Sequence, residues 1–184
     1  MRIIGGKARG TKLYTLEGES TRPTHDRIRE SLFNIIQFDI TNSVFLDLFS
    51  GSGAVGLEAV SRGAKKAILC EKERKAIEII KKNIIKTHLE DKIELYNMSF
   101  EKLLNSKLKE KLDYIYIDPP YKSEFVYESL KIILEKNIID ENTTIIIETD
   151  EEERILKQIS KLKLKIINKK KYGRVYLLFL KKDI

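Results

Sequence analysis

The sequence predicts an α/β fold in which a doubly wound, mostly parallel sheet of seven strands is covered by helices on both faces. Three observations predict it. From residue 44 onward, short runs of Val, Ile and Leu alternate with amphipathic stretches, which is the order of βαβ units. A glycine-rich turn follows the first of these runs. The last two apolar runs are joined by a tight turn, which indicates a C-terminal antiparallel hairpin.

The elements can be placed from the spacing of their apolar residues. A short continuous apolar run indicates a buried strand, and apolar residues on one face, such as Ile77, Ile80 and Ile84, indicate a helix. The expected strands are 44–48, 66–70, 93–96, 114–117, 144–147, 163–168 and 174–181, with a turn at 169–173. The expected helices run through Leu57 to Ser61, over 73–86, around 100–110 and over 124–135.

The first part of the chain has the pattern of an extension. Residues 2–5 and 11–14 flank Gly-Gly-Lys-Ala-Arg-Gly and predict a short basic hairpin. Pro23 then opens a helix whose apolar residues lie on one face. We therefore expect a small N-terminal hairpin-and-helix extension over residues 1–40 and a main domain over residues 41–184.

Composition excludes several classes of protein. The chain has 184 residues, 42% of them hydrophobic and 34% charged, which suits one globular core. No apolar run approaches the roughly 20 residues of a membrane-spanning helix. The start of the chain lacks the apolar stretch of a secretory signal, and the single cysteine, Cys70, excludes an internal disulfide framework. We expect a cytoplasmic protein that does not associate with a membrane.

The net charge is +7 and the isoelectric point is about 9.3, a balance that favours a polyanionic partner but also fits a solvated surface. Four basic residues precede the first acid, Glu17, so the basic charge is concentrated at the start of the chain. Lys169–Lys171, by contrast, are expected to form a solvated hairpin turn.

The glycine-rich turn has the sequence Asp47-Leu-Phe-Ser-Gly51-Ser-Gly53-Ala-Val-Gly56, and its GxGxxG string lets the backbone approach a ligand. Glu71, at the end of the next strand, can accept hydrogen bonds from both hydroxyls of a ribose. Nicotinamide dinucleotides and S-adenosylmethionine both fit this pattern. Asp47 favours S-adenosylmethionine, because a carboxylate there attracts an ammonium group and repels a pyrophosphate.

A second motif, Asp118-Pro119-Pro120-Tyr121, follows the strand predicted over 114–117. It lies at the same edge of the sheet, where ligands of open α/β sheets bind. The prolines remove two backbone donors, so the Asp118 carboxylate and the prolyl carbonyls form a group of acceptors beside an aromatic ring. Such acceptors can hold the exocyclic amine of a nucleobase in line for methyl transfer while Tyr121 stacks on the base.

Other chemistries lack the residues they need. Methylation at cytosine C5 requires an active-site thiolate, whereas Cys70 lies in the strand that leads to Glu71, on the cofactor side. A metal centre requires a cluster of ligands, whereas His25 and His88 are far apart and have no Cys or His partner at metal spacing. We therefore expect no metal.

At this point the chain resembles class I S-adenosylmethionine-dependent methyltransferases and, within them, the RsmD family of bacterial 16S ribosomal RNA guanine-N2 methyltransferases. The resemblance rests on Met1–Leu13, on Arg22–Asn34 and on the two motifs Asp47–Gly53 and Asp118–Tyr121, and it extends nearly end to end. It implies a Rossmann-like fold that transfers a methyl group to N2 of one guanine in 16S rRNA. The implied partner is 16S rRNA or the assembling 30S subunit, and the implied state is a monomer.

The resemblance also implies residue roles. The expected catalytic residues, which hold the amine and stack on the guanine, are Asp118, Pro119, Pro120 and Tyr121. The expected cofactor contacts are Thr24, Asp47, Phe49, Gly51, Ser52, Gly53, Glu71, Lys72, Ser99 and Phe100. The expected RNA contacts are Arg2, Lys7, Arg9, Lys12, Arg22, Arg27 and Arg29. In one departure, family members often bind the adenine amino group with an acid after the third strand, where this chain has Tyr96–Phe100, so Ser99 and the Phe100 backbone take that place.

Several alternatives stay open at this stage. The Asp-Pro-Pro-Tyr motif also serves adenine-N6 DNA methyltransferases and protein-glutamine methyltransferases. A DNA enzyme usually needs a sizeable target-recognition segment, which this chain hardly has, and the early basic cluster weakens the glutamine alternative. An NAD-dependent oxidoreductase would keep the glycine turn and Glu71 but has no use for the motif at Asp118. A ribosome-assembly protein without catalytic activity would bind RNA and not methylate it.

Overall fold

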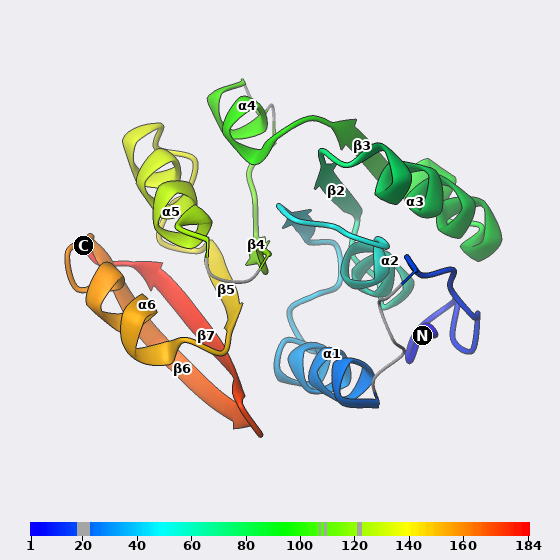
Figure 1. The fold of residues 1–184 in the computed structure, drawn as a ribbon, viewed down its shortest axis with the longest axis horizontal. Coiled ribbons are helices and arrows are strands. Elements are labelled where there is room, and N and C mark those ends of the chain that lie inside the picture. The colour runs from blue at the N-terminus through cyan, green and yellow to red at the C-terminus, as the bar shows by residue number, and fades with distance from the viewer. Residues whose placement is uncertain (18–22, 107, 109, 121–122) are drawn as a thin grey trace.

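The protein is described by a computed structural model that covers residues 1–17, 23–106, 108, 110–120 and 123–184, with only the backbone of Pro23 and Thr24. Seven strands form one sheet in the order β3-β2-β1-β4-β5-β7-β6 (Figure 1). They are β1 Val44–Asp47, β2 Lys66–Glu71, β3 Ile93–Asn97, β4 Tyr114–Ile117, β5 Thr144–Thr149, β6 Leu164–Tyr172 and β7 Val175–Lys182. The first five run parallel, and β7 is antiparallel to both β5 and β6. The predicted fold class is confirmed.

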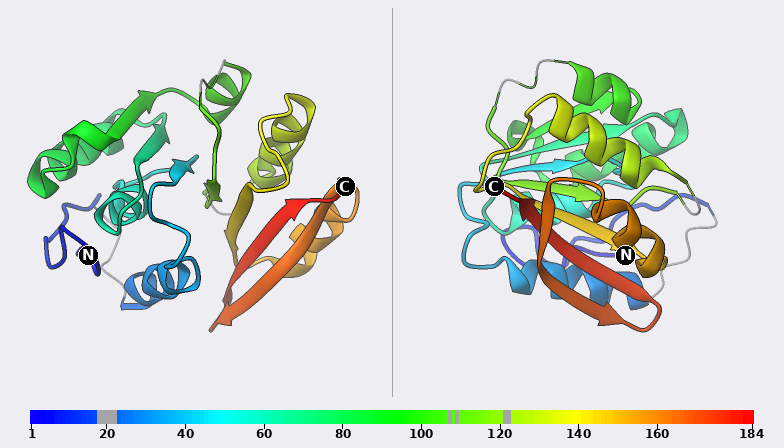
Figure 2. Two further views of the ribbon diagram at one scale, coloured as in Figure 1. Left: turned by 180° about the vertical axis from the view of Figure 1, so that it is seen from behind. Right: turned by 90° about the vertical axis from the view of Figure 1, so that its left-hand side faces the viewer.

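Helices cover both faces of the sheet (Figures 1 and 2). The helices are α1 Pro23–Ile35, α2 Ala54–Ser61, α3 Arg74–Thr87, α4 Phe100–Asn105, α5 Phe125–Glu135 and α6 Glu152–Ile159, with a short 3₁₀ turn η1 Glu90–Lys92. Buried residues of α1, α2 and α3 join one apolar cluster, and those of α4, α5 and α6 join the other. We call the side of the sheet covered by α1–α3 the first face and the side covered by α4–α6 the second face.

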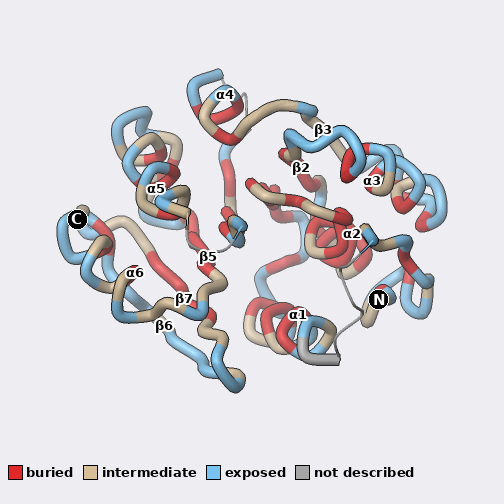
Figure 3. Tube along the Cα trace, viewed as in Figure 1, coloured by how far each residue is buried: buried red, intermediate tan, exposed pale blue. Residues whose placement is uncertain are grey.

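The central strands β1, β4 and β5 are mostly apolar because they are buried on both sides, and Figure 3 shows much of β4 and β5 as buried. Side chains alternate between the two faces along a strand. In β4, for example, Tyr114 and Tyr116 belong to the first-face core, and Ile115 and Ile117 belong to the second-face core. This alternation decides which side chains meet at each end of the sheet.

The described residues include an α-helix that the sequence did not predict, α6, between strands β5 and β6. Only Ile155 and Ile159 of this helix are buried, and its remaining residues are charged or polar apart from Leu156. Two buried residues at a spacing of four are too few to establish a helical period in the sequence. The helix expected around residues 100–110 is also shorter than predicted: α4 ends at Asn105.

A second correction concerns the C-terminal hairpin. Lys169–Lys171, expected in the turn, lie within β6 and pair with Leu178, Leu177 and Tyr176 of β7. The turn is therefore Gly173-Arg174, and Gly173 adopts the positive φ of 61° that such a two-residue turn favours. Lysine side chains on an edge strand extend into solvent, so their charge does not prevent the backbone from pairing.

The N-terminal segment forms the expected hairpin and packs on the first face. Leu13 N donates to Met1 O (3.0 Å) and Ile3 N donates to Thr11 O (3.0 Å). Ile3 and Leu13 are buried in the same core cluster as α1 and the sheet. A Cβ on Gly6 would lie 1.9 Å from Ser61 O, so the hairpin can approach the end of α2 this closely only with glycine.

The buried carboxylate of Glu58 in α2 holds this segment in place. It is fully buried and accepts hydrogen bonds from Ile4 N (2.9 Å) and Gly5 N (2.8 Å). It also forms ion pairs with Arg62 Nε (2.8 Å) and Arg29 Nε (3.4 Å). The hairpin, α1 and α2 are thus joined around one acid.

No helix within the described ranges is long and apolar enough to cross a membrane.

Candidate active site

Four carboxylates lie at the carboxyl edge of the sheet, where β1, β2, β4 and β5 end. Asp47 ends β1, Glu71 ends β2, Asp118 follows β4 directly, and Glu148 is the next-to-last residue of β5. Each stands two positions after a residue of the first-face core, so by alternation all four are directed to the first face. The register aligns β4 with both β1 and β5, which brings the two predicted motifs together.

The glycine turn connects β1 to α2 and is held by Glu71. Gly51 and Gly53 have positive φ values of 55° and 81°, a conformation that glycine adopts without strain. Gly51 N donates to Glu71 Oε2 (2.9 Å), and Glu73 N donates to Glu71 Oε1 (2.9 Å). A Cβ on Gly56 would lie 2.1 Å from Leu69 Cδ2, so this glycine lets α2 pack closely on β2.

Asp47 is a buried acid at the base of this turn, with 1% of its surface exposed. Burial is the main cause that raises the pKa of its carboxyl group from 3.8 to about 7, and the charges of Glu71 and Glu148 raise it further. The Phe49 amide donates a long hydrogen bond to Asp47 Oδ1 (3.4 Å), which acts in the opposite direction. A cation placed beside this carboxylate would therefore be strongly favoured.

Three phenylalanines form an aromatic cluster on the second-face side of the glycine turn. The ring centroids of Phe49 and Phe100 are 5.2 Å apart, those of Phe100 and Phe125 are 5.2 Å apart, and Phe49 stacks on Phe125 at 6.1 Å. The Lys72 ammonium lies 5.8 Å from the Phe125 centroid. Of these residues only Phe125 was not expected from the sequence, because it begins α5 far from both motifs.

Ser99 and Ser52 have structural contacts of their own. Ser99 is the N-cap of α4 and its Oγ accepts a hydrogen bond from Lys102 N (3.4 Å). Ser52 is buried, and its backbone carbonyl accepts from Asn83 Nδ2 (2.9 Å), an amide that also holds the backbone of Tyr14. Asn83 was not expected from the sequence, and it links α3, the glycine turn and the end of the N-terminal hairpin.

Helix α6 contacts Ser123, which lies just after the acceptor-rich motif that follows β4. Asp118 is exposed at the carboxyl edge and Pro119 is half-buried. The Ser123 hydroxyl donates to Pro120 O (2.9 Å), and Ser123 O accepts from both terminal nitrogens of Arg154 in α6 (3.2 Å each). The unpredicted helix α6 therefore holds Ser123, which in turn bonds to Pro120. Among the expected residues, Tyr121 and Arg22 lie outside the described residues, and the side chain of Thr24 is not described.

Beside Asp118, Glu148 is a further acid that was not expected from the sequence. The Tyr116 hydroxyl donates to Glu148 Oε2, and burial raises the pKa of the Glu148 carboxyl group. Burial and the neighbouring charges of Glu148 and Asp118 also raise the pKa of Tyr116 well above its usual value. The two strands are in register with Ile117 beside Ile147, so Asp118 and Glu148 occupy adjacent positions on one face.

The basic residues expected to contact RNA divide into two groups. Those that are exposed are Arg2, Lys7, Arg9, Lys12 and Arg27. Arg29 differs, because only 4% of its surface is exposed and its guanidinium bonds to Arg2 O, Asp26 and Glu58. Arg29 thus links α1 to the hairpin and α2, and its burial keeps it from contacting a phosphate at the surface.

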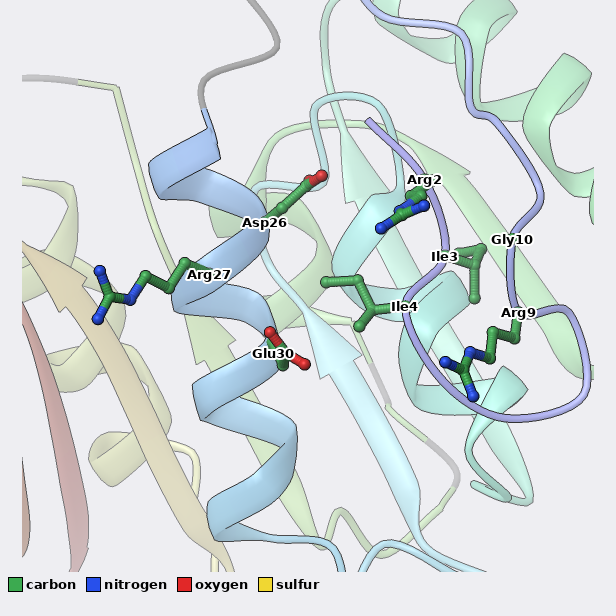
Figure 4. Close-up of a pocket in the computed structure, with 8 residues that line it drawn as sticks. All are labelled: Arg2, Ile3, Ile4, Arg9, Gly10, Asp26, Arg27 and Glu30. Carbon is green, nitrogen blue, oxygen red and sulfur yellow. The ribbon is translucent and has the colours of Figure 1, made fainter.

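The hairpin and α1 enclose a cavity of about 540 Å³ (Figure 4). Its lining residues are Arg2, Ile3, Ile4, Arg9, Gly10, Asp26, Arg27 and Glu30. Arg9 and Glu30 both lie at its lower end in this view, whereas Arg27 points away from the hairpin, toward the far side of α1. The cavity therefore carries mixed charge.

Cys70 shows no sign of a nucleophile. It is buried, its thiol donates to Met98 O (3.3 Å), and burial raises its pKa to about 12. A thiolate is therefore strongly disfavoured at this position. The described residues contain no group of three His, Cys, Asp or Glu that could hold a metal ion.

The sheet order, the glycine turn after β1 and the acceptor-rich turn after β4 define a class I methyltransferase, an enzyme that takes its methyl group from S-adenosylmethionine. A family model described as Conserved hypothetical protein 95 matches residues 1–181. The chain belongs to this family, the RsmD family of methyltransferases. Family membership removes the oxidoreductase alternative.

Individual relatives are similar over most of their length. The Bacillus subtilis protein YlbH is 34% identical over 175 residues, which cover 94% of each chain. The Haemophilus influenzae protein named Ribosomal RNA small subunit methyltransferase D is 34% identical over 158 residues, 85% of this chain and 82% of that one. The solved structure of the Escherichia coli protein yhhF superposes with a TM-score of 0.83 and 28% identity, over 100% of this chain and 98% of that one.

Proposed function

We propose that this protein transfers the methyl group of S-adenosylmethionine to the exocyclic N2 amine of a guanine in 16S ribosomal RNA, on the naked RNA or in the assembling 30S subunit. The observation that carries the proposal is the position of Asp118-Pro119-Pro120 beside the glycine turn, on neighbouring strands of one sheet. In this proposal, the acceptors for an amine lie next to the glycine turn that holds the methyl donor. The names of relatives such as Ribosomal RNA small subunit methyltransferase D support the RNA substrate.

The described residues fit S-adenosylmethionine. The buried carboxylate of Asp47, with its raised pKa, suits the ammonium of the amino-acid part, and Glu71 suits the ribose hydroxyls. The positive φ at Gly51 and Gly53 turns the backbone around the space that the cofactor would fill. The expected adenine contacts are Ser99 and the backbone of Phe100. Two further expected cofactor contacts, Phe49 and Lys72, lie at the aromatic cluster to which Phe100 belongs. When bound, the sulfonium supplies an electrophilic methyl group.

The chain's own contribution to the reaction is to orient the amine. The nitrogen lone pair of guanine N2 is delocalised into the ring, so it must be freed before it attacks. The Asp118 carboxylate and the Pro119 carbonyl accept its two N–H groups, which favours the pyramidal form and directs the lone pair toward the methyl group. Asp118 is then placed to take the proton that N2 loses after transfer. By the family resemblance, Tyr121 stacks on the base.

Glu148 favours guanine over adenine. Guanine has a donor at N1 next to its N2 amine, whereas adenine has an acceptor at N1 next to its N6 amine. Two acids at adjacent positions, Asp118 and Glu148, suit adjacent donors when both are ionised, whereas on adenine an ionised carboxylate at Glu148 would face the lone pair of N1. Tyr116 holds the Glu148 carboxylate in position for this role.

The test is methyl transfer from tritiated S-adenosylmethionine to unmethylated 30S particles and to naked 16S rRNA, followed by nucleoside analysis. We expect N2-methylguanosine as the product, and a product of N6-methyladenosine would contradict the proposal. Asp118→Ala should abolish transfer and leave the affinity for S-adenosylhomocysteine within about twofold, because its partner is the amine. Asp183→Ala, at an exposed aspartate far from the carboxyl edge, is the matched control.

A further inference from the structure

The C-terminal hairpin β6–β7 concentrates more positive charge than any other part of the chain. Residues 161–182 contain nine Lys and Arg and no Asp or Glu. Since the whole chain has a net charge of +7, the remainder carries a net negative charge. The basic residues are Lys161, Lys163, Lys165, Lys169, Lys170, Lys171, Arg174, Lys181 and Lys182.

The register of the sheet places one end of this hairpin at the carboxyl edge, where the active site lies. Glu148 pairs with Leu177, and Leu177 pairs with Lys170. Since Asp118 is adjacent to Glu148, Lys170 lies in the same row as Asp118, three strand spacings or about 14 Å away. The turn Gly173-Arg174 extends beyond this row, past the last residue of β5. A single RNA strand needs only a few nucleotides to cover such a distance.

The two faces of β6 differ in how far their charges are neutralised. Lys169 forms an ion pair with Glu152 of α6, and the ammonium groups of Lys169 and Lys171 lie 5.9 and 5.3 Å from the ring centroid of Tyr176. Lys170 projects from the other side of the strand, the first face, which it shares with Asp118. Lys170 and Arg174 are exposed, and among the described residues neither has an acidic partner.

The basic N-terminal segment lies elsewhere. It packs against α2 and α3, beside β1 and β2, whereas β6 is the outermost strand at the other end of the sheet (Figure 1). The carboxyl ends of β1 and β4, which carry the two motifs, lie between these two basic elements. An RNA that places its target base at Asp118 would therefore pass positive charge on both sides.

We propose that the end of the β6–β7 hairpin, through Lys170 and Arg174, binds phosphates of the rRNA strand that flanks the target nucleotide. The inference rests on the proposed function, since it takes RNA as the substrate. Lysines along an exposed edge strand also discourage pairing with other strands. That role does not account for Arg174, which lies in the turn and not in the ladder. Tyr172, packed on the first-face core beside Lys170, orients this end of the hairpin.

The test compares two charge reversals on one hairpin. The double variant Lys170→Glu/Arg174→Glu changes the end at the active site, and Lys163→Glu/Lys165→Glu changes exposed lysines at the opposite end. The substrate is unmethylated 16S rRNA, or unmethylated 30S particles if the wild-type enzyme acts only on the particles. Binding to this substrate is measured against salt concentration, and methyl transfer is measured on the same substrate.

For Lys170→Glu/Arg174→Glu we expect about a tenfold rise in Kd and KM at about 0.15 M salt, and a salt slope lower by about 1.4, because two contacts to single-stranded phosphates are lost. Affinity for S-adenosylhomocysteine and kcat at saturating RNA should not change, since neither residue contacts the cofactor or the amine. The control variant should retain the wild-type Kd and slope.

The outcomes separate this inference from the proposed function. If the wild-type protein methylates neither substrate, the proposed function fails. If it methylates RNA but Lys170→Glu/Arg174→Glu binds like the wild type, or no worse than the control variant, the hairpin contact is refuted. A reduced affinity with an unchanged salt slope would also refute it, because the loss would then not come from phosphates.

Discussion

Replacing the buried Asp47 by asparagine should make the protein more stable and, in the same variant, weaken cofactor binding. Burial raises the pKa of this carboxyl group to about 7 from 3.8, the value expected in the unfolded chain. A tenfold change in an ionisation equilibrium corresponds to about 1.4 kcal/mol, so the ionised side chain lowers the free energy of unfolding by on the order of 4 kcal/mol above pH 7. Asparagine has no charge to desolvate.

The sign of the pH dependence follows from the same difference in pKa. Between about pH 4 and pH 7 the folded protein retains a proton on Asp47 that the unfolded chain has lost. The stability of the wild type should therefore fall, relative to Asp47→Asn, as the pH rises through this window, and the difference should be constant above it. The new amide N–H groups need partners, so we expect about 2–4 kcal/mol and a Tm higher by about 5–10 °C at about pH 8.

The assay is urea unfolding of both proteins at intervals of about one pH unit from about pH 4 to about pH 8, with calorimetric titration of S-adenosylhomocysteine at the upper end of that range. Asp183→Asn, at an exposed site, should change neither quantity. A stability difference that stays the same over the whole range would refute the assignment of the raised pKa to Asp47. An unchanged affinity for S-adenosylhomocysteine would refute the pairing of Asp47 with the ammonium group, for which we expect a loss of at least tenfold.

Two further variants test the pocket and its support. Glu71→Ala should raise the Kd for S-adenosylhomocysteine at least tenfold, because it removes the proposed ribose acceptor and the acceptor of Gly51 N. Glu73→Ala, at an exposed neighbour, should leave the Kd unchanged, and equal Kd values in titrations of the two variants would show that Glu71 does not bind the ribose. Glu58→Ala should lower the free energy of unfolding by about 3–5 kcal/mol, because it leaves buried donors and cations without their acceptor. Urea unfolding measures this loss against the exposed Glu78→Ala, and similar losses in both would show that the network is not needed.

The two motifs could be located from the sequence because their chemistry is local. Gly51 and Gly53 adopt positive φ values, which favour glycine in such a turn. Asp118 is followed directly by two prolines, so the sequence alone identifies the acceptor-rich motif, whatever the exact end of the strand. The parallel strands could also be placed, since burial on both faces demands an unbroken apolar run. The bounds of these strands accordingly differ from expectation by at most two residues.

Features that depend on distant partners could not be predicted. Arg29 has the appearance of a surface cation in a basic segment, and only the fold places Glu58 beside it. Glu148 ends an apolar run like any other acid, and its proximity to Asp118 follows from the pairing of two strands 30 residues apart. The charge of Lys169–Lys171 predicts a solvent-exposed turn, whereas these residues pair with β7 and belong to a strand.

The sequence by itself determined the class of fold, the glycine turn and the position of the Asp-Pro-Pro motif after β4, because each depends on residue types at fixed short spacing. Only the tertiary structure decided which charges are buried, which acids share a face of the carboxyl edge, and which end of the basic hairpin lies beside the active site. Strand order and register set these relations. Both arise from backbone pairing between segments that are distant in the sequence, and the local sequence of one segment does not identify the segment with which it pairs.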